Sequence, residues 1–272
     1  MQSEKALPAT PLTLDGSYLL HQMFRVRWTV WRGLGATEQK HILDHSVKRL
    51  AAMEEKKQEA TGIASLLGHK GDLMLIHFRK TLDELNQAEL MITQLPIQEF
   101  LEPTTSYVSV VELGIYEASV KLYSDLVSKG LQPGTGEWNR EVEAELSKQR
   151  EASAARLWPE IPATKYACFY PMDRRRGETR NWYEESLADR QRMMEKHGAI
   201  GRRYVGEVRQ IISGSIGLDD WEWGVDLFSE DPAIFKRLIY EMRFDEVSAV
   251  YALFGSFYVG VRVPAAELAG IL

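Results

Sequence analysis

The feature that most restricts the fold of this chain is an order of predicted elements that occurs twice. Residue periodicity predicts strand, helix, strand, strand, helix, strand in residues 18–113, and the same order again in residues 165–263. This order is typical of a ferredoxin-like β-α-β-β-α-β unit, which packs both helices on one face of an antiparallel sheet. The other face stays apolar and uncovered, and two units can cover each other by closing into a barrel. We therefore expect an α+β fold in which two ferredoxin-like units form a dimeric α+β barrel within one chain.

The predicted segments divide the chain into an N-terminal half (12–115), a helical linker (116–164) and a C-terminal half (165–265). The first half has predicted strands at 18–28, 62–69, 72–79 and 106–113, and helices at 37–58 and 82–95. The second has strands at 165–170, 207–213, 221–228 and 254–263, and helices at 186–196, ending at Gly198, and 231–242. The linker has a PGTG turn at 133–136 and a charged helix from about 140 to 157. Connections of this length are often functional.

Composition excludes several classes of function. The formal charge of −6 provides no basic footprint for nucleic acid. No apolar run approaches the roughly 20 residues of a membrane span, and the N-terminal MQSEKALPATP lacks a signal sequence, so we expect it to form a short disordered tail. The single cysteine, Cys168, lies in an apolar strand and is predicted to be a buried hydrophobic residue. A cytoplasmic location fits this cysteine usage.

The stretch KYACFYPMDRRRG, residues 165–177, changes from apolar to cationic halfway. Strand alternation places Cys168 and Tyr170 on one face, and Pro171 is expected to end the strand directly after Tyr170. The arginines that follow Asp173 would form a cationic rim suited to an anionic ligand whose apolar body lies against the strand. The alternative interpretation is a surface loop beside a core strand.

Two further residues are candidates for a site. His197 shares a helical face with Met193 and Met194, so it is either a satisfied core histidine or an axial ligand to haem iron in an apolar pocket. The remaining histidines have no spacing typical of a zinc site. Gln210 is flanked on its own strand face by two β-branched residues and is expected to point into apolar surroundings, unless its strand is an edge strand.

Together these residues lie in stretches that resemble the coproheme decarboxylases of the chlorite dismutase-like haem proteins. The stretches are FYPMDRRRG, NWY, KHGAIGRRYVGEVRQIISGSIGLDDWEWGVDLFS and YEMRFDEVSA, with weaker similarity in TLDGSYLLH and SYVSVVELG. The resemblance implies an enzyme that uses hydrogen peroxide to convert Fe-coproporphyrin III (coproheme) to protohaem b through a three-propionate intermediate, releasing carbon dioxide. This is the last step of coproporphyrin-dependent haem biosynthesis. The iron porphyrin is both substrate and redox cofactor, and it is held in the second half of each subunit of a cytoplasmic homopentamer.

The resemblance also implies roles for single residues. Tyr170 matches the catalytic tyrosine, which is oxidised and takes a hydrogen atom from a propionate; His197, 27 positions later, matches the proximal iron ligand; Gln210, 13 positions further, matches the distal residue. Residues that match the porphyrin-binding positions are Arg156, Tyr170, Pro171, Met172, Asp173, Arg174 and Ser248, with Arg243 as a weaker candidate. Family members carry lysine at the position of Arg174, and a planar guanidinium positions a propionate differently from a mobile ammonium.

Other functions remain as alternatives to this interpretation. A chlorite dismutase uses a distal arginine, but the matching position is Gln210, and the adjacent Arg209 is expected on the opposite strand face. A non-catalytic porphyrin carrier and a haem-free barrel are the other two. The sequence leaves open whether coproporphyrin ferrochelatase delivers the substrate directly, whether the linker serves assembly or gating, and the number of subunits.

Overall fold

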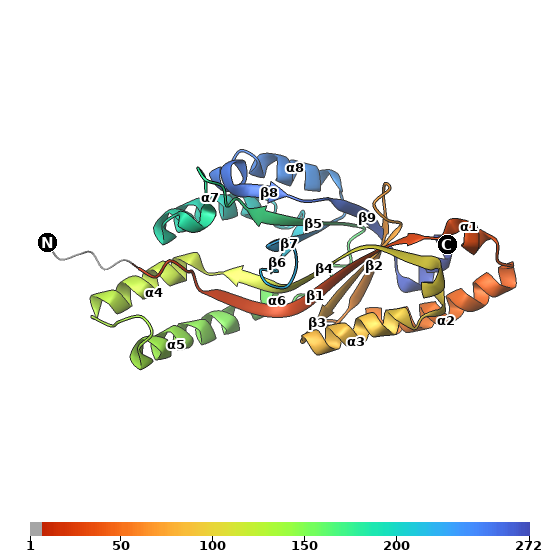
Figure 1. The fold of residues 1–272 in the computed structure, drawn as a ribbon, viewed down its shortest axis with the longest axis horizontal. Helices are drawn as coiled ribbons and strands as arrows, with labels where there is room; N and C mark the ends of the chain where they lie inside the picture. Colours follow the sequence, from red (N-terminus) through yellow and green to blue (C-terminus); the bar gives the residue numbers. More distant parts are fainter. Residues whose placement is uncertain (1–6) are drawn as a thin grey trace.

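The strands form a closed antiparallel barrel in the computed structural model, which describes residues 7–272 (Figure 1). The first half contributes strands in the spatial order β4-β1-β3-β2, and the second half contributes β6-β7-β5-β9. Pairing of β4 with β6 and of β2 with β9 joins the two sheets, and β8 extends the second one beside β5. The expected α+β fold of two ferredoxin-like units is confirmed.

The elements have the following bounds. The first half comprises β1 (Thr13–Val26), α1 (Trp28–Arg32), α2 (Ala36–Glu54), β2 (Thr61–Leu66), β3 (Leu73–Arg79), α3 (Leu82–Thr93), a 3-10 turn (Pro96–Phe100) and β4 (Leu101–Gly114). The connecting segment forms α4 (Tyr116–Ser128), α5 (Gly136–Ala152) and α6 (Ala154–Leu157). The second half comprises β5 (Tyr166–Arg174), α7 (Leu187–Arg203), β6 (Arg209–Gly214), β7 (Trp223–Ser229), α8 (Ala233–Met242), a π-helical turn (Val247–Tyr251), β8 (Ala252–Phe254) and β9 (Tyr258–Arg262).

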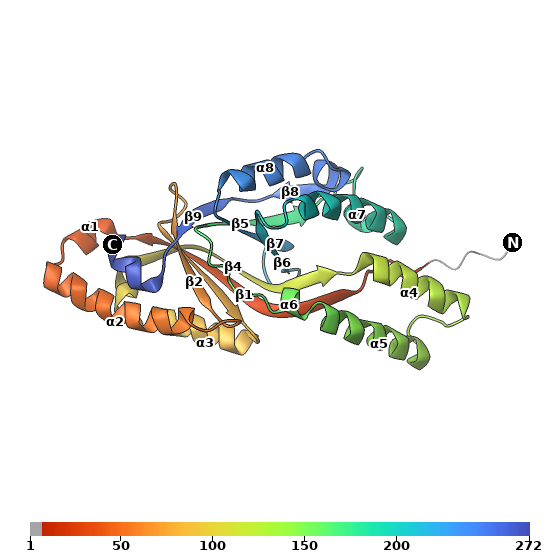
Figure 2. The ribbon, with the colours of Figure 1, turned by 180° about the vertical axis from the view of Figure 1, so that it is seen from behind.

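Apolar side chains from both halves fill the barrel. Met23 and Phe78 of the first half pack there with Phe169 and Phe228 of the second. Each half covers its outer face with its own pair of helices: α2 and α3 lie on one side of the barrel, and α7 and α8 lie on the opposite side (Figure 2). The uncovered sheet faces predicted from the element order are therefore buried against each other.

Three details of the second half differ from the sequence-based prediction. Helix α7 continues past Gly198 to Arg203, because glycine only weakens a helix that tertiary packing supports. Strand β5 continues past Pro171 to Arg174. Antiparallel geometry directs the nitrogen of Pro171 to the break between β8 and β9, where no carbonyl requires a donor. The single strand expected at 254–263 is divided into β8 and β9 at the same break.

The N-terminal tail and the linker also differ from expectation. Residues 1–6 lie outside the described part, but Leu7 and the following Leu12 pack against the α4–α5 hairpin, so the prediction of a disordered tail is wrong for residues 7–11. The linker begins with α4, which periodicity did not reveal, and its charged helix starts at Gly136. No helix within residues 7–272 has the length and apolar character needed to cross a bilayer.

A buried histidine network near the barrel wall makes stability depend on pH. His77 is fully buried; its Nε2 donates to Gln22 at 3.1 Å, and its Nδ1 accepts from Thr61 at 2.8 Å. Burial lowers the pKa of His77 to about 3. Since the unfolded chain binds a proton at this histidine below its ordinary pKa and the folded chain does not, acid favours unfolding.

We expect the free energy of unfolding to fall by about 1.4 kcal/mol per pH unit from His77 alone as the pH drops from roughly 6.5 toward the folded pKa. Urea unfolding of the wild type and of His77→Gln at several pH values between 7 and 5 measures this slope. The matched control is His69→Gln, which changes an exposed histidine. Equal slopes in the wild type and His77→Gln would contradict the assignment.

Candidate functional site

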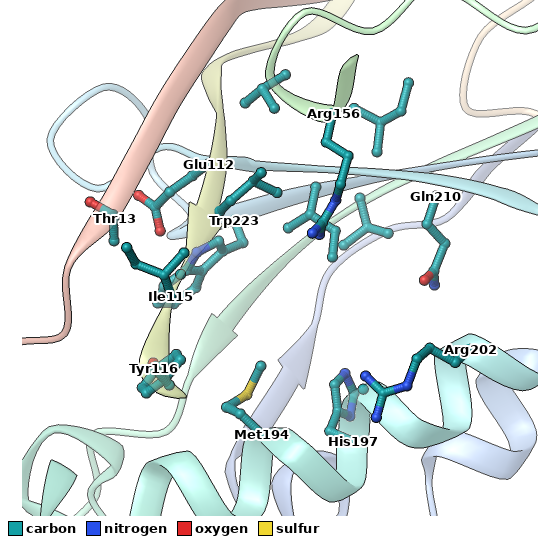
Figure 3. A pocket seen from close by; sticks show the side chains of 18 of the residues that line it. Thr13, Glu112, Ile115, Tyr116, Arg156, Met194, His197, Arg202, Gln210 and Trp223 are labelled. Atoms are coloured by element: carbon teal, nitrogen blue, oxygen red, sulfur yellow. The ribbon is translucent and has the colours of Figure 1, made fainter. Parts of the chain in front are cut away.

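A cavity of about 1910 Å³ lies against the second half of the barrel (Figure 3). Its walls come from the outer face of β5, β6 and β7, from α7, and from α4 and α6 of the linker. The linker therefore closes one side of the cavity. The volume exceeds that of ordinary small-molecule pockets, so it suits a large ligand.

The cavity exists because α7 packs differently from its counterpart in the first half. Helix α2 buries Ile42, Leu43, Ser46, Leu50 and Met53. Helix α7 buries Leu187, Arg190 and Met193, and the next two turns present Met194, His197, Gly198, Gly201 and Arg202 to the cavity. Two glycines in this face remove side-chain volume between the helix and the sheet. Each glycine inside a helix lowers helix stability by about 1 kcal/mol relative to alanine. This face of α7 therefore leaves open volume at the expense of helix stability.

His197 is held in one orientation by a carboxylate. Its Nδ1 lies 2.9 Å from Oδ2 of Asp245, which follows α8, and its imidazole lines the cavity (Figure 3). Asp245 also accepts from the backbone N–H groups of Val247 and Ser248 and from the Ser248 hydroxyl. Burial opposes the charged carboxylate, but the hydrogen bonds from His197 and Ser248 together hold the pKa of Asp245 below its ordinary value. A donor at Nδ1 leaves Nε2 as a free lone pair, which is the form that ligates a metal.

Tyr170 is buried in the sheet wall of the same cavity. Its ring stacks on Phe257 at 4.5 Å between centroids and lies 5.7 Å from Phe254. Burial raises the pKa of Tyr170, so the phenol stays protonated at neutral pH. Cys168, on the same strand face, is also buried, and burial raises its pKa to about 12, which makes it a poor nucleophile.

Arg174 is a partly buried cation with an unused donor. Its guanidinium lies over Trp182 at 5.1 Å and Trp223 at 5.7 Å, and its Nη1 is buried without a hydrogen-bond partner among residues 7–272. Burial lowers the pKa of Arg174, but guanidinium remains charged in proteins. A buried donor without a partner is costly, so this position fits a ligand that supplies an anionic oxygen.

Gln210 lies on a strand paired along its length with β7, and β6 also meets β4 at its end. The strand is therefore not a free edge, and its cavity-facing Gln210 side chain approaches Gly201 of α7. Arg209, by contrast, is exposed at the start of the strand and shares the opposite face with Ile211, as the alternation predicts.

The other predicted residues divide between the cavity and its surroundings. Arg156 projects from α6 into the cavity (Figure 3), and Met172 and Ser248 also line it. Because β5 remains a strand to Arg174, Pro171 and Asp173 take the alternate face, and Asp173 accepts the backbone N–H of Glu222 at 2.8 Å. Arg243 packs on the Phe254 ring at 3.9 Å instead of lining the cavity.

Three features of the site were missed by sequence reasoning: the orienting carboxylate of Asp245, the Trp182–Trp223 pair around Arg174, and a cavity-facing carboxyl at Glu112. Asp245 stands 48 positions from His197. The capping pattern Asp-x-x-Ser at 245–248 is its one local signal. Glu112 and Trp223 have no local signal because strand pairing brings them to the site, and Trp182 lies in a short 3-10 turn whose position depends on the tertiary fold.

The side chains of the cavity fit a metal ion whose other ligands come from a bound cofactor or substrate and not from the protein. Within the described residues there is no group of three or more His, Cys, Asp or Glu side chains that could hold a metal ion. A single oriented imidazole in a large cavity, with an unpaired guanidinium nearby, fits an iron porphyrin with acidic side chains.

We expect Asp245→Ala to lower the free energy of unfolding by about 1–3 kcal/mol, because it leaves the buried donors of His197, Val247 and Ser248 unpaired. Glu246→Ala is the matched control: it removes an exposed ion pair with Arg192, for which less than about 1 kcal/mol is expected. Chemical denaturation of both variants measures the difference. Equal losses would show that Asp245 contributes no more than a surface carboxylate.

Comparisons with known proteins agree on one family. A coproheme decarboxylase from Staphylococcus saprophyticus is 41% identical over 257 residues, which cover 93% of this chain and 94% of the relative. A structure of a heme-binding protein from Thermus thermophilus superposes with a TM-score of 0.81 at 37% identity, covering 98% of both chains.

More distant structures and a family model extend the comparison. Chlorite dismutase from Candidatus Nitrospira defluvii, in complex with imidazole, has a TM-score of 0.68 at 18% identity over 94% of this chain and 95% of that one, which shows a shared fold alone. The family model described as chlorite dismutase matches residues 39–263. This match covers most of the chain and agrees with the relative of 41% identity: the chain belongs to the chlorite dismutase family.

Proposed function

We propose that this protein is a hydrogen peroxide-dependent coproheme decarboxylase that converts Fe-coproporphyrin III to protohaem b through a three-propionate intermediate. The observation that carries the proposal is the placement of Tyr170, His197 and Arg174 around one cavity. The 41% identity to a coproheme decarboxylase over 93% of the chain supports the same reaction. This reaction is the last step of coproporphyrin-dependent haem biosynthesis.

Binding requires an axial ligand and partners for acidic side chains. The Nε2 of His197, freed by the Nδ1 contact with Asp245, would be the axial ligand. The guanidinium groups of Arg174 and Arg156 would hold propionates. The Ser248 hydroxyl, which donates to Asp245, would join them only by turning from Asp245 to a propionate. When bound, the iron porphyrin supplies the redox centre at which hydrogen peroxide is reduced. Gln210, which lines the same cavity, would offer that centre a neutral amide, which cannot act as a base.

Tyr170 is the residue that would act on the propionate. Its phenol is buried and neutral, so its oxidation releases a proton together with an electron and generates a group that can take a hydrogen atom from carbon. Arg174 lies four residues further along the same strand, so it reaches the cavity from the face that carries Tyr170. A propionate held by Arg174 or Arg156 is thereby presented to the phenol.

The wider setting follows the same proposal. We propose that residues 165–265 act as the porphyrin-binding half, with 12–115 completing the barrel and 116–164 closing the cavity. Pro171 and Asp173 would act by shaping β5, since their side chains leave the cavity face. We also propose a homo-oligomer, a pentamer by family resemblance, in the cytoplasm. Direct transfer of substrate from coproporphyrin ferrochelatase is part of this proposal.

The test is conversion of coproheme by the pure protein with peroxide, followed by mass analysis of the porphyrin. Tyr170→Phe should abolish carbon dioxide release and vinyl formation while coproheme still binds, because phenylalanine keeps the ring contacts with Phe254 and Phe257 but has no O–H bond to break. Tyr166→Phe, on the same face of β5, is the matched control and should retain activity. A carrier would bind coproheme and leave its mass unchanged in the wild type as well.

Arg174 allows a second test of the binding mode. We expect Arg174→Ala to weaken coproheme binding by about 10- to 100-fold, as loss of a charge-assisted contact worth roughly 1.5–3 kcal/mol implies. Arg174→Lys restores the charge and should recover part of this affinity, but it lacks the planar contact with Trp182 and Trp223. Titration of the absorbance of coproheme measures both variants. Unchanged affinity in Arg174→Ala would remove Arg174 from the site.

A further inference from the structure

The proposed reaction consumes a proton in the cavity. Conversion of a propionate to a vinyl group breaks one carbon–hydrogen bond and the carbon–carbon bond to the carboxylate. The carboxylate leaves as carbon dioxide. It releases two electrons and one proton. Reduction of one hydrogen peroxide to two waters takes those two electrons and two protons. Each decarboxylation therefore takes up one further proton, and a protonated group in the cavity wall can supply it.

Glu112 is a carboxyl group in that wall. It lies on β4, lines the cavity, and stands next to Trp223 and Thr13 at the end of the cavity away from Gln210 (Figure 3). Its strand partner Asp15 is exposed to solvent. Partners directly opposite in an antiparallel pair have Cβ atoms about 5 Å apart. Glu112 thus lies between the inside of the cavity and the carboxylate of Asp15 at the protein surface.

The neighbouring backbone leaves room for this carboxyl. Gly214 of β6 stands beside Glu112, and a Cβ at position 214 would come within 2.5 Å of Glu112 Oε2. Gly214 is also the strand partner of Trp223. Any larger residue at position 214 would displace the Glu112 carboxyl. Glycine at this position therefore allows Glu112 and Trp223 to lie side by side in the cavity wall.

We propose that Glu112 delivers to the cavity the proton that each decarboxylation consumes, an inference that rests on the function proposed above. Rebinding of a proton from solvent would proceed by way of exposed Asp15. Chemistry within the cavity would receive the proton through water along the wall that carries Trp223.

The charged and titratable groups around Glu112 agree with this role. Burial raises the pKa of Glu112, the indole of Trp223 opposes this, and Asp15 raises it further. Tyr116 of α4 also lies near, but burial raises its pKa, so it holds its proton too tightly to donate near neutral pH. Arg174 of β5 and Arg156 of α6 line the same cavity and carry no proton that they can release. Among these neighbours, Glu112 is the group that can be protonated and still donate.

The first test needs no substrate. In the ligand-free protein labelled with carbon-13 at glutamate Cδ, one resonance should titrate above the ordinary glutamate range and be absent from Glu112→Gln. The second test is the decarboxylation rate against pH. The wild-type rate should fall as pH rises through that titration, and Glu112→Gln should lower the rate by about 100-fold, as loss of a general acid implies. Gly214→Ala, which keeps the carboxyl but displaces it, should also slow the reaction.

Glu102→Gln, an exposed change on the same strand, is the matched control and should leave rate and titration unchanged. A Glu112→Gln variant with the wild-type rate and pH profile would overturn the role of Glu112 while leaving the proposed function intact. Absence of any elevated glutamate titration would overturn it as well. A wild type that binds coproheme and peroxide but forms no protohaem would overturn the proposed function itself, and this inference with it.

Discussion

Closure of the sheet is the constraint on which the rest of the structure depends. Each half presents a sheet face that its own helices do not cover, and pairing of β4 with β6 and of β2 with β9 buries the two faces together. Phe78 and Phe169, from different halves, then share one core. Because this core lies inside the barrel, the space between the outer sheet face and α7 is not needed for packing. That space holds the cavity.

The two halves therefore use one architecture for different purposes. In the first half, Leu43 and Leu50 of α2 close the helix against the sheet. In the second, His197 and the small residues that follow it on α7 face an open volume. The linker completes this volume by bringing Arg156 to its wall, so its length has a structural use.

The cavity wall combines groups whose protonation is controlled by burial. The phenol of Tyr170 is kept neutral, Arg174 keeps an unused donor, and His197 is oriented by a carboxylate that hydrogen bonds keep charged. The arrangement at Arg174 is not what stability alone would favour, since a buried guanidinium donor without a partner costs free energy. The proposed binding of an iron porphyrin with acidic side chains would explain why these three groups lie around one cavity.

Local pattern predicted the element order, the facing of Tyr170 and the separation of Gln210 from Arg209, because periodicity decides these within a few residues. It failed where tertiary context decided. Gly198 did not end α7, since the helix has support beyond it, and Pro171 did not end β5, since its missing donor faces a break in the neighbouring strand. The contact of Asp245 with His197 and the contact of Glu112 with Trp223 could not be predicted, because these partners lie far away in the chain and meet only through the fold.

The structure of the coproheme complex tests the central claim most directly. The account predicts iron bound to Nε2 of His197, a propionate in contact with Arg174, and the Tyr170 hydroxyl within hydrogen-bonding distance of a propionate. Iron held by another residue, or a porphyrin whose propionates all lie away from Tyr170, would contradict it.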